Sequence, residues 1–456
     1  MAAVLDINDA GLLVHQDGSE LLESPGFITH EKKSLHVGIE GAARVKLMPT
    51  QTQYGFWEKF STDTLEQAHP VAATQADLAF RHLEHLWSVV GKELGELIIC
   101  VPSDFSRQQL GLLLGIARHV GMPVRALVDA AVAGSHQPVP GRQLFHLDVH
   151  LHRTVITGLD QGPWLTRAAA QSSQEFSLLR LQDAWSEAVA QVFVQSTRFD
   201  PMHTADTEQQ MFDRMSGWLS LLSDQDETEL ELSHGDQRFS ARLQRRTMLK
   251  AVDPLYRRLL DFVAEQLPEG KPVTLQVAHR LAHLPGAMSA LQTLPDVDLV
   301  VLSRTATADG VSRLYLDRNA PADAEVPMVT RLPWFKSTDL ASHSEQLAGY
   351  RRRQPTHLLH QAVAHPLDLD EFWVGSELGQ DQQGIHLAAS MPGIAGRHFR
   401  LRRQDGELVL EDLSGGATVL NEKPLEGRRE VAIGDRIRIG SPGTEFMLIS
   451  VAEHGA

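Results

Sequence analysis

The chain has 456 residues, of which 42% are hydrophobic, and its formal net charge is −16 at pH 7. This length and composition exclude a disordered protein and predict two or three globular domains with full cores. The acidic balance excludes nucleic acid and anionic membranes as main partners, because phosphate binding depends on Lys and Arg.

The first predicted element is a strand over residues 4–7, close to the N-terminus. The N-terminal residues lack the basic and then apolar pattern of a signal peptide, and no apolar stretch approaches the ~20 residues that span a bilayer. The single cysteine, Cys100, excludes an intrachain disulfide and fits a reducing compartment. The sequence therefore predicts a cytoplasmic protein without membrane insertion.

Residues 97–154 hold the clearest pattern of secondary structure. Three strands are predicted there, over 97–100, over 124–128 and up to residue 148. Ser106 and Gln109 form a capping pattern, and Gly121 supplies a C-terminal stop, so a helix is predicted between the first two strands. The same patterns predict later helices and a strand, over 174–195, 207–222, 247–267 and 273–277. The alternation up to residue 318 indicates an α/β domain.

In order and spacing, these segments resemble the actin-like ATPase fold of DnaK-type heat-shock chaperones. Val101-Pro102 is similar to the family's VPAYF strand end, and residues 128–134 (VDAAVAG) are similar to its NEPTAAA segment. The strand that ends at Asp148 stands where the family has its DLGGGT phosphate loop. The resemblance implies a two-lobed nucleotide-binding-domain fold over residues 1–318. Another α/β domain with a similar strand and helix rhythm is the alternative.

The glycines that surround the phosphates in that family are missing. Residues 150–152 read His-Leu-His after Asp148, residues 8–10 read Asn-Asp-Ala after Asp6, and residues 278–279 read Ala-His. Glycine lets the backbone approach a phosphate closely, whereas these side chains occupy the same volume. The substitutions therefore predict a pseudo-ATPase without a cofactor.

The resemblance also leaves a divergent ATPase open. Asp6, Asp129 and Asp148 would then be the catalytic carboxylates that position Mg²⁺ and water. Asp6, Asp148, Glu208 and His279 would contact the nucleotide, which would be ATP with Mg²⁺. The family's catalytic lysine has two candidates in this chain, Lys46 and Lys59.

Histidines stand at several of the lost glycines, which raises a metal-binding hypothesis. Alternate residues from His146 to His152 would face one way if their strand continued. Candidate ligands for zinc or a similar ion are His150, His152, His279 and His283. The alternative is that these histidines fill an inactive cleft or bond backbone carbonyls, since the chain has 22 histidines.

Residues 319–355 are rich in Pro, Ala, Asp and Ser, which predicts a linker. We expect Trp334 and Phe335 to pin part of it to a neighbouring surface, and residues 351–353, an Arg run, to be a solvated segment. From residue 356 to residue 453, short alternating strands predict an all-β sandwich.

The words FWVGS, GRHFRL, LEDLSGGATVLNEKPL and IGDRIRIG in this segment resemble a forkhead-associated (FHA) domain. The resemblance implies an FHA-like sandwich that binds protein partners, in many members phosphothreonine peptides. When the family's binding positions are transferred to this chain, the resemblance implies four candidate phosphopeptide residues, Arg397, Ser414, Thr418 and Asn421. It also implies that His398 is a structural buttress. Ser376, Ala395 and Gly416 stand where the family has an arginine, a serine and an asparagine, so a phospho-independent interaction surface is favoured.

Together these observations predict a chaperone-ATPase-like pseudoenzyme. It would act in the cytoplasm as a scaffold or regulatory factor that binds protein partners through the FHA-like module and the two-lobed cleft. Two alternatives remain, a divergent ATP-binding and ATP-hydrolysing chaperone-like ATPase, and a phosphothreonine-peptide reader.

Overall fold

The computed structural model describes residues 2–316, 326–334 and 355–449, apart from short gaps at 33, 92–93, 361–362, 368–370, 380–381, 389–392, 405–406, 422, 426 and 441–442. The chain divides into two compact units near residue 336. None of the helices in the described ranges is long and apolar enough to cross a membrane.

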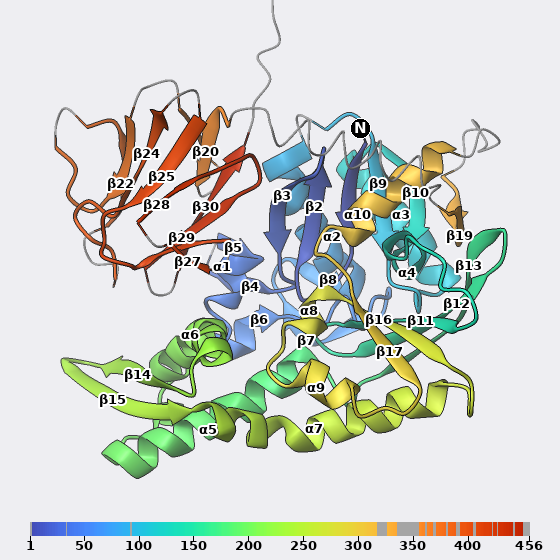
Figure 1. Cartoon of the computed structure of the whole chain (residues 1–456), viewed down its shortest axis with the longest axis horizontal. Coiled ribbons are helices and arrows are strands. Elements are labelled where there is room, and N and C mark those ends of the chain that lie inside the picture. Colours follow the sequence, from blue (N-terminus) through green and yellow to red (C-terminus); the bar gives the residue numbers. More distant parts are fainter. Residues whose placement is uncertain are drawn as a thin grey trace, which may run out of the picture. The chain divides into compact units, whose positions relative to one another are not determined.

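The first large sheet of the N-terminal unit has six strands in the order β18-β10-β9-β1-β2-β3 (Figure 1). β1 pairs antiparallel with β2 and parallel with β9, so an N-terminal hairpin lies beside parallel strands. The apolar run of β9 is buried throughout, as expected for a strand covered on both faces. The elements of this lobe are β1 (Ala3–Asp6), β2 (Leu12–Gln16), β3 (Ser19–Ser24), α2 (Gln75–Val90), β9 (Leu97–Val101), α3 (Arg107–Val120), β10 (Val124–Asp129), α4 (Ala130–Gly134) and β18 (Met328–Val329).

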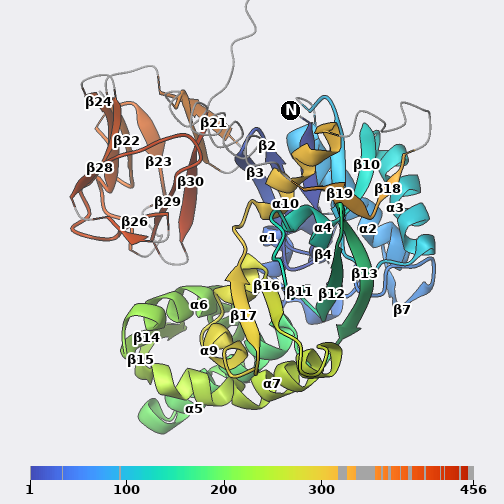
Figure 2. The ribbon, with the colours of Figure 1, turned by 45° about the vertical axis from the view of Figure 1, so that its right-hand side comes forward.

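The second large sheet repeats this arrangement in the order β17-β16-β11-β12-β13-β19. β11 pairs antiparallel with β12 and parallel with β16, as β1 does with β2 and β9. Helices α5 and α7 run beneath this sheet and contribute large apolar side chains to its core (Figures 1 and 2). The elements of this lobe are β11 (Gln143–Val149), β12 (Thr154–Gln161), β13 (Trp164–Ser173), α5 (Leu178–Thr197), α7 (Arg245–Gln266), β16 (Val273–Val277), β17 (Val297–Val301) and β19 (Arg331–Pro333).

Smaller elements are attached to each large sheet. A three-stranded sheet and a short hairpin follow β3, with α1, and consist of β4 (Ile28–Glu31), β5 (Ser34–Val37), α1 (Ile39–Ala42), β6 (Thr52–Gln53), β7 (Thr64–His69) and β8 (Ala72–Thr74). The second lobe adds α6 (Ala205–Asp224), the hairpin β14 (Glu227–His234) and β15 (Gln237–Gln244), α8 (His279–Ala282) and α9 (Ala287–Leu291). After β17 the chain returns to the first lobe, where α10 (Ala306–Val311) packs against α4 and β1.

Local signals in the sequence account for the best predicted helix. The side chain of Ser106 accepts a hydrogen bond from the amide of Gln109, whose side chain caps the Ser106 amide in return. Gly121 ends α3 with φ 83°, a left-handed conformation that favours glycine. The helices predicted over 174–195, 207–222 and 247–267 are confirmed as α5, α6 and α7 with ends shifted by a few residues.

Residues 326–334 differ from the linker that their composition predicts. β18 extends the first sheet by pairing with β10, and β19 extends the second sheet by pairing with β13. Leu332 is buried between the sheets, and the indole of Trp334 donates to the carbonyl of Gly162 at 2.9 Å. Burial and pairing with existing edges therefore override the Pro-rich composition, and the expected anchoring by Trp334 is confirmed. Phe335, residues 351–353 and the rest of the predicted linker lie outside the described residues.

The C-terminal unit is an all-β sandwich, as predicted. One sheet has the order β21-β20-β30-β29-β26-β27 and the other β23-β22-β24-β25-β28. Alternate residues such as Leu408 and Leu410, and Ile437 and Ile439, fill the space between the sheets. The strands are β20 (His357–His360), β21 (Val363–Pro366), β22 (Glu371–Gly375), β23 (Gly384–His386), β24 (Phe399–Gln404), β25 (Glu407–Asp412), β26 (Thr418–Leu420), β27 (Lys423–Pro424), β28 (Arg428–Glu430), β29 (Arg436–Ile439) and β30 (Thr444–Ile449).

Candidate functional site

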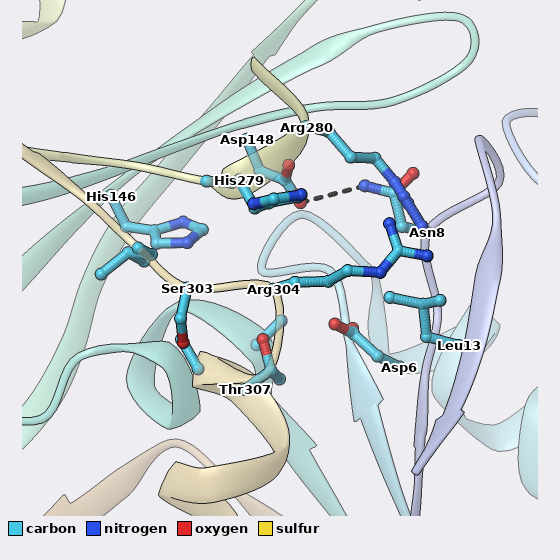
Figure 3. Close-up of a pocket in the computed structure, with 14 residues that line it drawn as sticks. Asp6, Asn8, Leu13, His146, Asp148, His279, Arg280, Ser303, Arg304 and Thr307 are labelled. Carbon is cyan, nitrogen blue, oxygen red and sulfur yellow. Dashed lines mark hydrogen bonds between the residues drawn. The ribbon is translucent and has the colours of Figure 1, made fainter. Parts of the chain in front are cut away.

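The two lobes of the N-terminal unit line a small, partly open cavity of about 50 Å³ (Figure 3). Its lining comes from the ends of β1, β11 and β16 and from the segment after β17, and includes Asp6, Asn8, His146, Asp148, His279, Arg280, Ser303, Arg304 and Thr307. One water molecule needs roughly 10–15 Å³ of such space. The cavity therefore has room for a few water molecules and is far too small for a nucleotide.

The two turns at the centre of the cleft are bonded directly to each other. The amide nitrogen of Asn8 donates to a carboxylate oxygen of Asp148 at 3.0 Å and to the carbonyl of Val149 at 3.1 Å. The backbone amide of Leu151 donates to Oδ1 of Asp9 at 2.7 Å. The turn after β1 and the turn after β11 are thus hydrogen-bonded to each other across the cleft.

Asp9 is the buried anion of this contact. Burial alone would raise the pKa of its carboxyl, but the bond with His150, the charge of Arg153 and the Leu151 amide lower that pKa to about 2. Nδ1 of His150 lies 3.5 Å from Oδ1 of Asp9. A backbone N–H and nearby cationic groups are the partners that a bound phosphate attracts, and here the Leu151 amide and His150 contact the carboxylate of Asp9, while Arg153 donates to Asp104.

Two arginines from the second lobe reach across the cleft to acidic residues of β3. Arg304 donates to both carboxylate oxygens of Glu20, at 2.8 and 3.1 Å, and to Glu23 at 2.5 Å. Arg280 donates to Glu23 at 3.1 Å and also bonds the carbonyl of Gly11. Both guanidinium groups project into the cavity (Figure 3). They fill space in the cleft and neutralise the carboxylates that face them.

A further contact joins the lobes at the rim of the cleft. Nζ of Lys46 lies 2.8 Å from Oε1 of Glu208, so these two candidates bind each other. The side chain of Gln209 accepts from the Lys46 amide at 2.7 Å and donates to the carbonyl of Ala42 at 3.0 Å. Contacts between the lobes therefore extend beyond the residues that line the cavity.

The structure brings two of the three predicted catalytic carboxylates together. Asp6 and Asp148 both line the cavity, and burial with the charge of Asp148 raises the pKa of Asp6 to about 6, despite nearby Arg280. Asp129 is buried elsewhere and caps α4 by accepting from the amide of Val132 at 3.1 Å. Ser103 also donates to Asp129, at 2.9 Å, so this carboxylate has a structural role.

The four candidate metal ligands do not converge. β11 ends at Val149, so the alternation that would align His150 with His152 stops there. His152 stacks on Tyr54 and contacts its carbonyl oxygen at 2.9 Å, away from Asp9 and its partner His150. The rings of His279 and His283 lie 4.0 Å apart, and His283 contacts the carbonyl of His279. Within the described ranges, no three His, Cys, Asp or Glu side chains are arranged to hold a metal ion.

In the C-terminal unit, the candidate loop between β25 and β26 folds around its own carboxylate. Asp412 accepts from the hydroxyl of Ser414 at 2.6 Å, from the amide of Gly416 at 2.6 Å and from the hydroxyl of Thr418. The amide of Ala417 donates in turn to the Ser414 hydroxyl at 2.9 Å. Burial would raise the pKa of Asp412, but these bonds lower it. Ser414 and Thr418 are therefore committed within the loop.

The other two phosphopeptide candidates have different surroundings. Asn421 donates to Asp435 at 2.8 Å and accepts from the amide of Arg436 at 2.9 Å, which makes it a bridge between β-strands. His398 is buried and accepts from the Ala395 amide at 3.0 Å, as expected for a buttress. Arg397 is exposed at the surface of the module.

Comparison with known proteins assigns one part of the chain. Residues 373–440, which run from β22 through β29, match the model of the FHA domain family. This match confirms the resemblance to an FHA domain over these residues and indicates a protein-interaction or phosphopeptide-binding module. No curated protein matches the chain significantly. The family match leaves residues 1–318 without an assigned family.

Sequence reasoning missed the arginines and glutamates that close the cleft. Arg280 comes directly after residues 278–279, which stand where the resemblance implies a nucleotide-binding loop, whereas no motif in the sequence includes Arg304. Their partner Glu23 is separated from Arg304 by 281 residues, so no local pattern connects the two.

Proposed function

We propose that residues 1–318 form an actin-like ATPase fold that no longer binds nucleotide, and that the chain works as a scaffold or regulatory protein-binding factor in the cytoplasm. The repeated strand order of the two large sheets supports this fold, because β1, β2 and β9 and then β11, β12 and β16 are arranged alike. The FHA domain supplies the protein-binding part. No nucleotide or metal cofactor belongs to this proposal.

The closed cleft is the observation that carries the proposal. Both turns that would cradle phosphates are bonded to each other through Asn8 and Asp9. The cavity that remains is about 50 Å³. A nucleotide could enter only after the lobes separated and these contacts broke.

The cost of that opening can be estimated from the contacts themselves. Hydrogen bonds to charged groups contribute about 1.5–3 kcal/mol each. Breaking four of them, at Asp9, Glu20, Glu23 and Asp148, would cost about 6 kcal/mol, which lowers the apparent affinity for any ligand that requires opening by about 10⁴-fold. Ordinary micromolar binding of ATP would thereby become too weak to matter in a cell.

Calorimetry and thermal shift with the full chain test this proposal. ATP, ADP and Mg²⁺ are titrated separately and together, with an active actin-like ATPase as the assay control. We expect no heat of binding and no shift in unfolding temperature. The competing ATPase hypothesis relies on Asp6 and Asp148 at neighbouring strand ends, and micromolar affinity for ATP would favour it and overturn the scaffold.

Phosphothreonine reading is the second candidate function, and exposed Arg397 is the observation that favours it. Against it, the hydroxyls of Ser414 and Thr418 already bind Asp412. A phosphothreonine peptide library and its unphosphorylated counterpart, each presented to the full chain, distinguish phosphothreonine reading from phospho-independent binding. Selective capture of phosphorylated peptides would make the module a phosphopeptide reader.

A further inference from the structure

Trp373 lies on the outer face of the sheet that contains β22 and carries an arginine on its ring. Its neighbours Phe372 and Val374 are buried in the core of the sandwich, so alternation turns Trp373 outward, where it is half-buried. The guanidinium carbon of Arg397 is 5.6 Å from the centre of the ring, and that of Arg400 is 5.3 Å away. Both distances are within the range of cation–π attraction.

The two arginines differ in their charge partners. Arg400 donates to Glu371 at 2.9 Å and to Glu411 at 2.8 Å, so its charge is neutralised on the sheet. Arg397 is exposed, and no carboxylate among the described residues lies within ion-pair distance of it. The side chain of Glu377 packs beside Gly396 without forming an ion pair. Arg397 therefore presents a positive charge that the module itself leaves uncompensated.

The backbone around Arg397 is held firmly in place. The amide of Glu377 donates to the carbonyl of Gly396 at 2.8 Å, and the amide of His398 donates to the carbonyl of Val374 at 2.9 Å. A Cβ atom on Gly375 would come within 2.2 Å of the Gly396 carbonyl oxygen, so the two chain segments are in close contact. Because the segment and the stacked side chain are already ordered, binding an anion there would lose little conformational entropy.

The state of the neighbouring loop determines which anion fits. A phosphate monoester carries nearly two charges and is held by several donors together, but the loop hydroxyls and the Gly416 amide are taken by Asp412. A carboxylate is satisfied by the two parallel N–H groups of one guanidinium. A single free arginine on an aromatic ring is therefore better matched to Asp or Glu than to phosphothreonine.

We propose that Trp373 and Arg397 form a docking surface for an unphosphorylated acidic peptide segment of a partner protein. A Glu or Asp carboxylate of that segment accepts two hydrogen bonds from Arg397, and an adjacent apolar side chain packs on the exposed part of the Trp373 ring. This inference rests on the protein-binding function proposed for the FHA domain. It places the contact on the sheet face and away from the β25–β26 loop.

Binding of peptide libraries to the full chain tests the proposal. Three libraries share the same random flanks and carry Glu-Glu, phosphothreonine or Gln-Gln at the centre. We expect enrichment from the Glu-Glu library. Affinity for the best enriched peptide should fall about tenfold for Arg397→Gln. Arg397→Lys should also bind more weakly, because lysine keeps the charge and lacks the planar fork.

Arg429→Gln is the matched control, because it removes the same charge from an exposed position on β28. Equal losses of peptide affinity in the Arg397 and Arg429 variants would mean that only the net charge matters, and would overturn the docking surface. Enrichment from the phosphothreonine library, or from none of the three, would overturn it as well. Unchanged thermal unfolding of the variants separates loss of binding from loss of folding. Binding of ATP concerns only the N-terminal unit, so failure of the pseudo-ATPase proposal would be seen separately.

Discussion

In the cleft of the N-terminal unit and in the β25–β26 loop of the FHA domain, a carboxylate of the chain itself accepts hydrogen bonds from nearby backbone or side-chain groups. In the cleft, Asp9 binds an amide 142 residues away, and Asn8 binds Asp148 across 140 residues. In the loop, Asp412 binds groups only two to six residues away. The same chemistry thus joins two lobes in one case and shapes a single turn in the other, so its loss should have very different consequences.

The largest effect is expected for Asp9→Ala. The substitution leaves the buried Leu151 amide without its acceptor and removes the carboxylate beside Nδ1 of His150, which should lower the free energy of unfolding by about 3 kcal/mol. Urea denaturation measures it. Asp261→Ala removes an exposed carboxylate of α7 and should stay within about 0.5 kcal/mol; equal effects of the two variants would contradict the central role of Asp9.

Arg304→Gln should have the next largest effect. It leaves Glu20 and Glu23 facing each other in a partly buried site, which should cost about 2 kcal/mol of unfolding free energy. The control is Arg257→Gln on the surface of α7, where the side chains of Arg257 and Asp253 are 72% and 54% exposed, and a loss below about 0.5 kcal/mol is expected.

A triple variant tests whether charge pairing accounts for the contribution of Arg304. Changing Glu20 and Glu23 to Gln together with Arg304→Gln should recover part of the lost stability, because the two carboxylates then no longer repel each other and Arg280 keeps its bond to the carbonyl of Gly11. A triple variant less stable than Arg304→Gln alone would show that charge pairing is not what joins the lobes at this point.

Asp412→Ala should cost less, about 1.5 kcal/mol, because water reaches the exposed loop and replaces the lost acceptor. Hydrogen exchange should accelerate at the Ser414 and Gly416 amides and stay unchanged in the N-terminal unit. Asp412→Asn keeps one acceptor oxygen for the hydroxyls of Ser414 and Thr418 and should lose about half as much. A change of exchange in the cleft would contradict the local character of this contact.

The effect expected for Asp6→Asn is a gain of stability, opposite in sign to the losses above. The folded pKa of Asp6 is about 6, above its ordinary value of 3.8, so ionised Asp6 destabilises the fold. That cost develops between pH 3.8 and 6, is complete above pH 6 and is absent below 3.8. The variant should therefore be more stable by up to about 3 kcal/mol at pH 7 and unchanged at pH 3.5. Unfolding curves at the two pH values measure this difference. An equal gain in unfolding free energy at both pH values would refute the raised pKa of Asp6.

Local patterns in the sequence predicted the elements but not the contacts between them. The capping pair of Ser106 and Gln109 defines the start of α3, and the lost glycines around Asp9 and His150 indicate that the cleft is filled. Arg304 gives no such signal, because its glutamates lie more than 280 residues away. In the FHA domain, position in the motif identified Ser414 and Thr418, but only the structure shows that they face Asp412.

The edge strands β18 and β19 follow each other with Thr330 alone between them. β18 forms two residue pairs with β10, and β19 forms three with β13. One residue extends at most about 3.6 Å. The connection through Thr330 therefore holds the edges of the two sheets at a nearly fixed separation. Mechanical tension applied to the chain at Trp334 would reach the second sheet first and load the first sheet only after β19 had peeled away.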